Sequence, residues 1–202
     1  MDRSHGYERV AAEFLAGRGN GAPGVGTAAV RAWARQLAPG ATVLELGCGP
    51  GVPITAVLVE AGLAVHAVDA SPTFVAAFKR RFPDTPIACE PVEESSFFDR
   101  RFDAVLSWGL MFLLSPPSQR ALIRRMGEAL TSGGRLLFTS PAEAATWSDA
   151  MTGCESRSLG AEEYRRLLSD AGLRVLQEYD DEGENHYYDA IKGPIDSPTE
   201  RG

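Results

Sequence analysis

The alternation of apolar and polar stretches predicts that strands and helices follow one another along most of the chain. Apolar runs typical of buried strands end at turn signals and occupy residues 42–46, 63–68, 85–90 and 135–139, with a further run beginning at Phe102. Apolar residues at helical spacing lie between these runs, at 52–61, 71–81 and 119–130. This order predicts an open α/β sheet in which crossover helices connect parallel strands.

The two ends of the chain differ from its centre. At the N-terminus, helical patterns at 7–15 and from residue 27 flank a Gly-rich run at 16–26. Towards the C-terminus, residues 140–159 are irregular, a helix is expected at 160–171, and strands are expected at 173–179 and 186–191. We therefore expect an N-terminal helical lid or linker over residues 1–40, a domain over 41–193 and a disordered tail over 194–202.

The clearest candidate for a ligand site is the loop after the first expected strand, which reads Glu45-Leu46-Gly47-Cys48-Gly49-Pro50-Gly51. Gly47 can take backbone angles closed to other residues, and Gly49 lets the main chain approach a ligand without a Cβ in the way. The spacing G-x-G-x-G differs from the dinucleotide fingerprint, whose third Gly is replaced here by Val52. The loop therefore favours a nucleoside ligand other than a dinucleotide.

Composition and charge limit the kinds of partner expected for this protein. The 202 residues are 44% hydrophobic, which suits one domain with a single core, and the net charge is −7. Basic pairs such as Arg124-Arg125 fit solvated helix faces, so a small-molecule substrate is favoured over nucleic acid. The Cys residues are widely spaced, so we expect a reducing cytoplasm and no disulfide framework or metal site. No apolar run approaches membrane-spanning length, so no membrane partner is expected.

The glycine loop resembles the first motif of the class I S-adenosylmethionine-dependent methyltransferases, (D/E)-x-G-x-G-x-G, and the chain looks like the small-molecule members of types 11 and 12. The stretch that starts Phe102-Asp103-Ala104-Val105 is similar to the fourth motif, and 130–136 is similar to L-x-P-G-G-x-L, with Ser132 where Pro is usual. The resemblance covers residues 42–192. It implies a doubly wound, Rossmann-like α/β fold with seven strands, mostly parallel with an antiparallel last strand, and S-adenosyl-L-methionine as the cofactor.

The resemblance also implies the roles of the cofactor-site residues. The three glycines admit the methionine and sugar portion, and Glu45 orients the loop. Asp69 ends the second strand, where nucleotide-binding α/β folds place an acid that accepts hydrogen bonds from ribose hydroxyls. Alternatively Asp69 caps the next helix, although Ser71 is the better candidate for that cap. The full set of expected cofactor-binding residues is Glu45, Gly47, Cys48, Gly49, Gly51, Asp69, Ala70, Val92, Glu93 and Ser107.

Two parts of this set carry open questions. Val92 and Glu93 would flank adenine, but the Asp common in the family aligns with Pro91, so Glu90 or Glu93 would have to meet the exocyclic amine. Ser107 and Trp108 should lie at the end of the fourth strand, where the methyl donor meets the methyl acceptor. Trp108 either packs in the core or places its aromatic face against the sulfonium. The Pro-Pro clamp typical of enzymes that methylate planar nitrogens is absent at 107–112, which disfavours a nucleobase or glutamine acceptor.

Four further residues are candidates without a fixed role. Tyr7 and Arg18 could contact the methionine carboxylate if the N-terminal segment closes as a lid, whereas composition fits a plain linker equally well. His186 could act as a general base because His titrates near neutral pH, but a lone His on a strand is more often structural. Trp147 lies in the irregular stretch, which either builds the acceptor pocket or is a surface loop.

Methyl transfer is an in-line displacement that depends mainly on holding donor and acceptor in line, so an acceptor that is already nucleophilic needs no dedicated base. Two other functions remain open. An NAD-dependent oxidoreductase would use the same strand, loop and acid, although the missing third Gly counts against it. A non-catalytic domain with a methyltransferase fold is also possible, because fold does not fix function.

Overall fold

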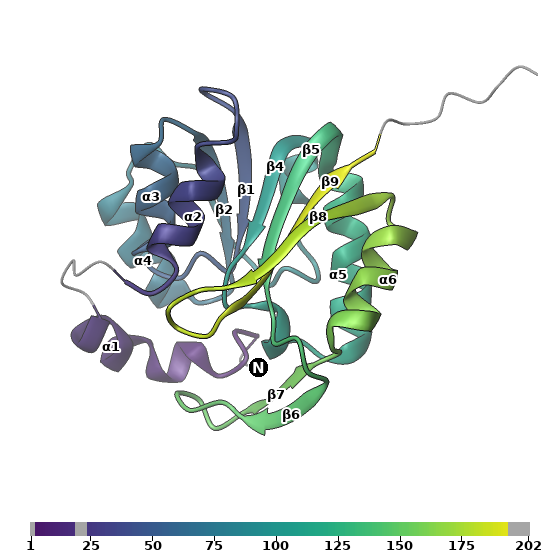
Figure 1. Cartoon of the computed structure of the whole chain (residues 1–202). Coiled ribbons are helices and arrows are strands. Elements are labelled where there is room, and N and C mark those ends of the chain that lie inside the picture. Colours follow the sequence, from purple (N-terminus) through teal and green to yellow (C-terminus); the bar gives the residue numbers. More distant parts are fainter. Residues whose placement is uncertain (1–2, 19–23, 194–202) are drawn as a thin grey trace, which may run out of the picture.

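The protein forms one central sheet with helices on both faces (Figure 1). The computed structural model describes residues 3–18 and 24–193, without the side chain of Arg18. The centre of the Gly-rich run, the tail at 194–202 and the Arg18 side chain therefore lie outside the described residues. Within the described ranges, no helix is both long and apolar enough to cross a membrane.

Seven strands make up this sheet, in the order β3-β2-β1-β4-β5-β9-β8. Their bounds are β1 Thr42–Leu46, β2 Ala64–Asp69, β3 Ile87–Cys89, β4 Phe102–Ser107, β5 Leu130–Thr139, β8 Leu173–Asp180 and β9 His186–Lys192. The first five pair in parallel, and β9 runs antiparallel to both β5 and β8. The expected seven-stranded, mostly parallel sheet with an antiparallel last strand is confirmed.

Crossover helices bury the sheet on both faces, which is why its strands read as continuous apolar runs. One face packs on α2 (Thr27–Ala34), α3 (Ile54–Glu60) and α4 (Pro72–Arg81), and the other on α5 (Pro116–Ala129) and α6 (Ala161–Asp170). Trp33 of α2 is fully buried in the core. Burying a side chain of this size stabilises the fold by about 2–3 kcal/mol.

Helix starts follow the capping signals of the sequence. Ser71 accepts a hydrogen bond from the Phe74 N–H at 3.1 Å, and Ser115 accepts one from the Ser118 N–H at 3.3 Å. In both cases Pro occupies the first helical position, where its missing N–H costs nothing. The third crossover helix, expected from residue 119, therefore begins earlier, at Pro116.

The expectation that 140–159 is irregular was wrong. Residues 145–148 and 155–158 form a small antiparallel hairpin, β6 (Ala145–Ser148) and β7 (Glu155–Ser158). Its strands are short and polar, and the buried positions of β7, where a half-buried strand usually carries apolar residues, hold Ser156 and Ser158. The hairpin is held by tertiary contacts and not by its own pattern, so the sequence carried little signal for it.

Two elements meet beyond the carboxyl ends of the parallel strands. Helix α1 (Tyr7–Arg18) and the β6–β7 hairpin both lie at the lower end of the sheet in Figure 1. The loops after β1, β2, β3 and β4 end at the same edge, because the carboxyl ends of parallel strands share one side of a sheet. This edge is where open α/β sheets bind ligands.

Candidate active site

The glycine loop after β1 is fixed to the neighbouring strand. The N–H groups of Gly47 and Cys48 donate to the Val68 carbonyl oxygen at 2.8 and 3.3 Å. Gly51 has φ +83°, and a Cβ there would lie 2.5 Å from the Phe82 ring, so packing and backbone both require glycine. Gly49 has φ +55°, and a Cβ there would meet no atom within 4 Å. The loop is therefore closely packed against α4 and Phe82 at Gly51, whereas the space next to the Gly49 Cα is open.

Asp69 joins this loop to the start of α4. Its Oδ2 accepts a hydrogen bond from the Gly49 N–H at 2.8 Å, and its Oδ1 accepts one from the Ser71 N–H at 2.9 Å, with Ala70 half-buried between them. Burial raises the pKa of Asp69 to about 6, against the effect of these two hydrogen bonds. The two strongest signals in the sequence are thus in direct contact.

Glu45 and Cys48 face inward from the same loop. The Glu45 side chain is 2% exposed and accepts a hydrogen bond from Thr55 Oγ1 of α3 at 2.7 Å. Burial raises the pKa of Glu45 to about 8. Burial also raises the pKa of the Cys48 thiol, so the thiol stays protonated and is a poor nucleophile. Glu45 therefore links the loop to the helix that follows it.

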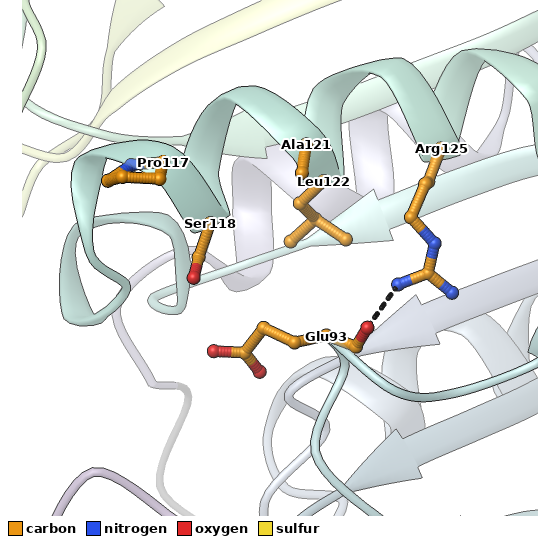
Figure 2. Close-up of a pocket in the computed structure, with 6 residues that line it drawn as sticks. All are labelled: Glu93, Pro117, Ser118, Ala121, Leu122 and Arg125. Carbon is orange, nitrogen blue, oxygen red and sulfur yellow. Dashed lines mark hydrogen bonds between the residues drawn. The ribbon is translucent and has the colours of Figure 1, made fainter.

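The segment after β3 is held from two sides. Val92 is buried in the core, while Glu93 lies 3.5 Å from His5 Nε2, a contact that is the main cause of its lowered pKa. From α5, Arg125 donates to the carbonyl oxygens of Val92 and Glu93 at 2.7 and 3.1 Å, and Figure 2 shows the second of these bonds. The expectation of a solvated helix face was therefore wrong for Arg125.

Helix α1 contacts the edge at several points. Glu8 accepts hydrogen bonds from Thr73 Oγ1 at 2.7 Å and from Ser71 Oγ, both at the start of α4. Tyr7 lies 6.4 Å from the Phe74 ring between centroids. At the other side of α1, the Arg9 guanidinium donates to Cys154 Sγ at 3.5 Å in the β6–β7 turn. The helix therefore spans from the Asp69 region to the hairpin.

Ser107 and Trp108 lie where β4 ends, but in different surroundings. The Ser107 hydroxyl is fully buried and has no hydrogen-bond partner among the described residues. Trp108 Nε1 donates to the Tyr187 hydroxyl at 2.8 Å, and that hydroxyl donates to Asp181 Oδ2 at 2.8 Å. The indole also covers Gly26, where a Cβ would lie 2.6 Å from Nε1. This packing favours a structural role for Trp108.

Both ring nitrogens of His186 already have carboxylate partners. Nδ1 lies 2.7 Å from Asp180 Oδ1, and Nε2 lies 3.3 Å from Glu178 Oε2. The ring also meets Tyr188 edge to face at 4.9 Å. A general base needs a nitrogen within reach of the acceptor, so this geometry favours the structural alternative for His186.

The hairpin brings an aromatic pair to the same edge. Trp147 of β6 lies 5.6 Å from Phe112 of the short helix η2 (Met111–Leu113). Beneath the pair, buried Gln119 donates to the Arg157 carbonyl of β7 at 2.7 Å and accepts from the Tyr164 hydroxyl at 2.6 Å. These partners are far apart in sequence, which is why the sequence did not point to them.

The strand order, the glycine loop after β1 and the acid after β2 are those of the Rossmann-like fold shared by class I S-adenosylmethionine-dependent methyltransferases. Residues 43–134 of the chain match the family described as "Methyltransferase domain". The family match supports S-adenosylmethionine over the nicotinamide cofactor of the oxidoreductase alternative.

Among individual proteins, the chain is similar to the cypemycin N-terminal methyltransferase of a Streptomyces species. The two are 39% identical over 128 residues, which cover 60% of this chain and 51% of the relative, so the chain spans about half the length of that protein. The structure of the CcbJ methyltransferase from Streptomyces caelestis matches with a TM-score of 0.75 at 15% identity, covering 96% of this chain and all of that one.

Two further solved structures share the fold. The glycopeptide N-methyltransferase MtfA complexed with S-adenosyl-L-methionine matches with a TM-score of 0.68 at 20% identity, covering 84% of this chain and 95% of that one. A 1,6-didemethyltoxoflavin-N1-methyltransferase from Burkholderia thailandensis, with its substrate and S-adenosylhomocysteine, gives 0.69 at 22% identity, covering 96% and 92%. At these identities the structures establish the fold.

Proposed function

We propose that this protein transfers the methyl group of S-adenosyl-L-methionine to a small-molecule acceptor by in-line displacement. The observation that carries the proposal is the open space above Gly49, next to a carboxylate that is fixed by backbone hydrogen bonds. A ligand can approach the main chain closely there, because no Cβ stands in the way. When bound, S-adenosyl-L-methionine supplies an electrophilic methyl group on a sulfonium.

The proposed cofactor residues suit this ligand chemically. Each Asp69 oxygen accepts one backbone hydrogen bond and keeps a lone pair, so the carboxylate can still accept hydrogen bonds from both ribose hydroxyls. Ser107 offers a buried hydroxyl at the end of β4 that no described residue uses. A buried hydroxyl without a partner costs free energy, which a ligand hydrogen bond would recover. Val92 and Glu93 are proposed to flank the base.

Of the expected lid or linker over residues 1–40, only the part up to helix α1 is proposed to act as a lid, with Tyr7 on its inner side, because α2 packs in the core against the sheet. Helix α1 contacts the start of α4 and Cys154 in the β6–β7 turn. Arg3 and His5, which precede the helix, contact Glu94 and Glu93 in the segment after β3. A lid at this edge would exclude water from the reacting atoms and hold the acceptor in line with the methyl group. Alignment of that kind can supply about 7–11 kcal/mol of the barrier in the best cases.

The Phe112 and Trp147 rings are proposed as one wall of the acceptor site. An aromatic wall binds a flat or apolar acceptor through buried area and ring stacking. A second candidate acceptor is the N-terminal amine of a peptide, favoured by the similarity to the cypemycin N-terminal methyltransferase. Each His among the described residues contacts a charged side chain: His5 contacts Glu93, His66 contacts Arg100, and His186 contacts Asp180 and Glu178. No His is therefore proposed as a general base, and the acceptor is expected to be a nucleophile that is already deprotonated.

The test is an acceptor screen with S-adenosyl-L-methionine, read by mass spectrometry for a gain of one methyl group. Small amines, phenols and thiols form one set, and short peptides with free or acetylated N-termini form the other. Methylation within the small-molecule set supports the main proposal. Methylation of free but not acetylated peptides would replace it with the second candidate.

A further inference from the structure

One arginine outside the family's motifs holds the segment after β3. Arg125 Nη1 donates to the carbonyl oxygens of Val92 and Glu93 at 2.7 and 3.1 Å, and Nη2 donates to the carbonyl oxygen of Ser95. The guanidinium also lies over the Phe97 ring, 4.3 Å from its centroid. One side chain of α5 therefore fixes the backbone of residues 92–97 through three hydrogen bonds and a cation–π contact.

The neighbouring arginine shows what a solvated side chain on this helix does. Arg124 is 62% exposed and pairs with Glu128 one turn along the same helix, as expected for a surface ion pair. Arg125 has no such exposed partner in its hydrogen bonds, since all of its acceptors are backbone carbonyls. A planar fork with several donors suits converging carbonyls, which a single ammonium could not all reach.

A cavity of about 260 Å³ lies beside this arrangement, as Figure 2 shows. Glu93 stands on one side and the first turns of α5 on the other, with Pro117, Ala121 and Leu122 as the apolar wall and Arg125 at one end. Glu93 also contacts His5 of the N-terminal segment, with His5 Nε2 3.5 Å from Glu93 Oε1. The segment that Arg125 fixes therefore contacts both this cavity and the proposed lid.

We propose that Arg125 is a positioning residue of the cofactor site. It holds residues 92–95 so that Val92 and Glu93 present a fixed edge to the base of the nucleoside, and it thereby sets selectivity for that base. This inference rests on the proposed function, since it assumes that the nucleoside binds at the carboxyl edge. It adds a residue from α5 to a site otherwise built from the loops after β1, β2 and β3 and from the end of β4.

The experiment compares R125M, which keeps an unbranched stem and loses every donor, with R124M as the matched control. Calorimetry measures the affinity of each protein for S-adenosylhomocysteine and for S-inosylhomocysteine, in which oxygen replaces the 6-amino group. We expect R125M to bind S-adenosylhomocysteine about tenfold more weakly than the wild type, and its preference between the two bases to shrink. R124M should match the wild type on both measures. Thermal melting checks that each variant is folded.

A second variant, R125K, covers the case in which R125M does not fold. It keeps the charge and loses the fork, so we expect a smaller loss of affinity in the same direction and a partial loss of base preference. If a folded R125 variant melts lower but keeps the affinity and base preference of R124M, the residue is merely structural and the inference is overturned. If the wild type itself does not bind S-adenosylhomocysteine, the proposed function fails first.

Discussion

The two halves of the candidate site are built in different ways. The cofactor half, formed by the glycine loop and Asp69, comes from two neighbouring parallel strands and is held by short backbone hydrogen bonds. The hairpin half, formed by η2 and the β6–β7 hairpin, is assembled from distant segments through the Phe112–Trp147 pair and the hydrogen bond from Gln119 to the Arg157 carbonyl oxygen. The first half rests on backbone contacts between segments close in sequence, whereas the second rests on side-chain contacts between distant segments.

The largest expected effect is a difference between alanine substitutions at two glycines of the cofactor half, Gly51 and Gly49. G51A would place a Cβ against the Phe82 ring at a positive φ, at a cost of about 2–5 kcal/mol, so we expect a strongly lowered melting temperature and loss of S-adenosylhomocysteine binding. G49A also places a Cβ at a positive φ, at a cost of about 1–2 kcal/mol, but meets no neighbouring atom, so the melting temperature should fall less than in G51A while binding weakens. Melting and calorimetry on both variants check this. Equal behaviour of the two would contradict the open space above Gly49 as a ligand site.

A smaller effect is expected at Asp69. D69A removes the carboxylate proposed to bind ribose and should weaken S-adenosylhomocysteine binding about tenfold or more. D69N keeps one acceptor oxygen for the backbone, so it serves as the control for loop geometry. If D69N folds like the wild type and binds equally well, the carboxylate has no role in the ribose contact.

The glycine loop and Asp69 also show which parts of the candidate site could be predicted from the sequence. The glycine loop and Asp69 were found because their chemistry depends on backbone angles and on position at a strand end, both of which are readable locally. Arg125 was misjudged, because an arginine on a helix face looks solvated until the segment that it binds is placed. The hairpin was missed for a similar reason, since its strands are specified by contacts with residues more than thirty positions away, such as the Gln119 bond to Arg157.

Glu45 gives a pH-dependent prediction. Its pKa lies near 8 in the folded protein and near 4.5 when unperturbed, so between these values the folded state keeps a proton that the unfolded state has lost. This group therefore stabilises the fold most below pH 4.5, and its contribution falls as the pH rises to about 8, with a limit of about 1.4 kcal/mol per pH unit. Asp69 acts in the same direction up to about pH 6.

E45Q keeps an acceptor for Thr55 but cannot ionise. Its melting temperature should fall less than that of the wild type between pH 6 and pH 8, a range in which Asp69 contributes little to the difference. If the melting temperatures of the two proteins fall by the same amount between pH 6 and pH 8, Glu45 is not held protonated by burial.

The smallest expected effect on cofactor binding lies in the hairpin half. W147A removes one member of an aromatic pair worth about 0.5–1.5 kcal/mol, so affinity for S-adenosylhomocysteine should stay within about twofold of the wild type. Turnover of any acceptor found in the screen should fall in the same variant. A large loss of cofactor affinity in W147A would show that the two halves are coupled.

The most direct test of the account is calorimetric titration of the full chain with S-adenosylhomocysteine, with NAD titrated in parallel. We predict binding of S-adenosylhomocysteine at one site and no heat from NAD. Binding of NAD alone would contradict the account and restore the oxidoreductase alternative.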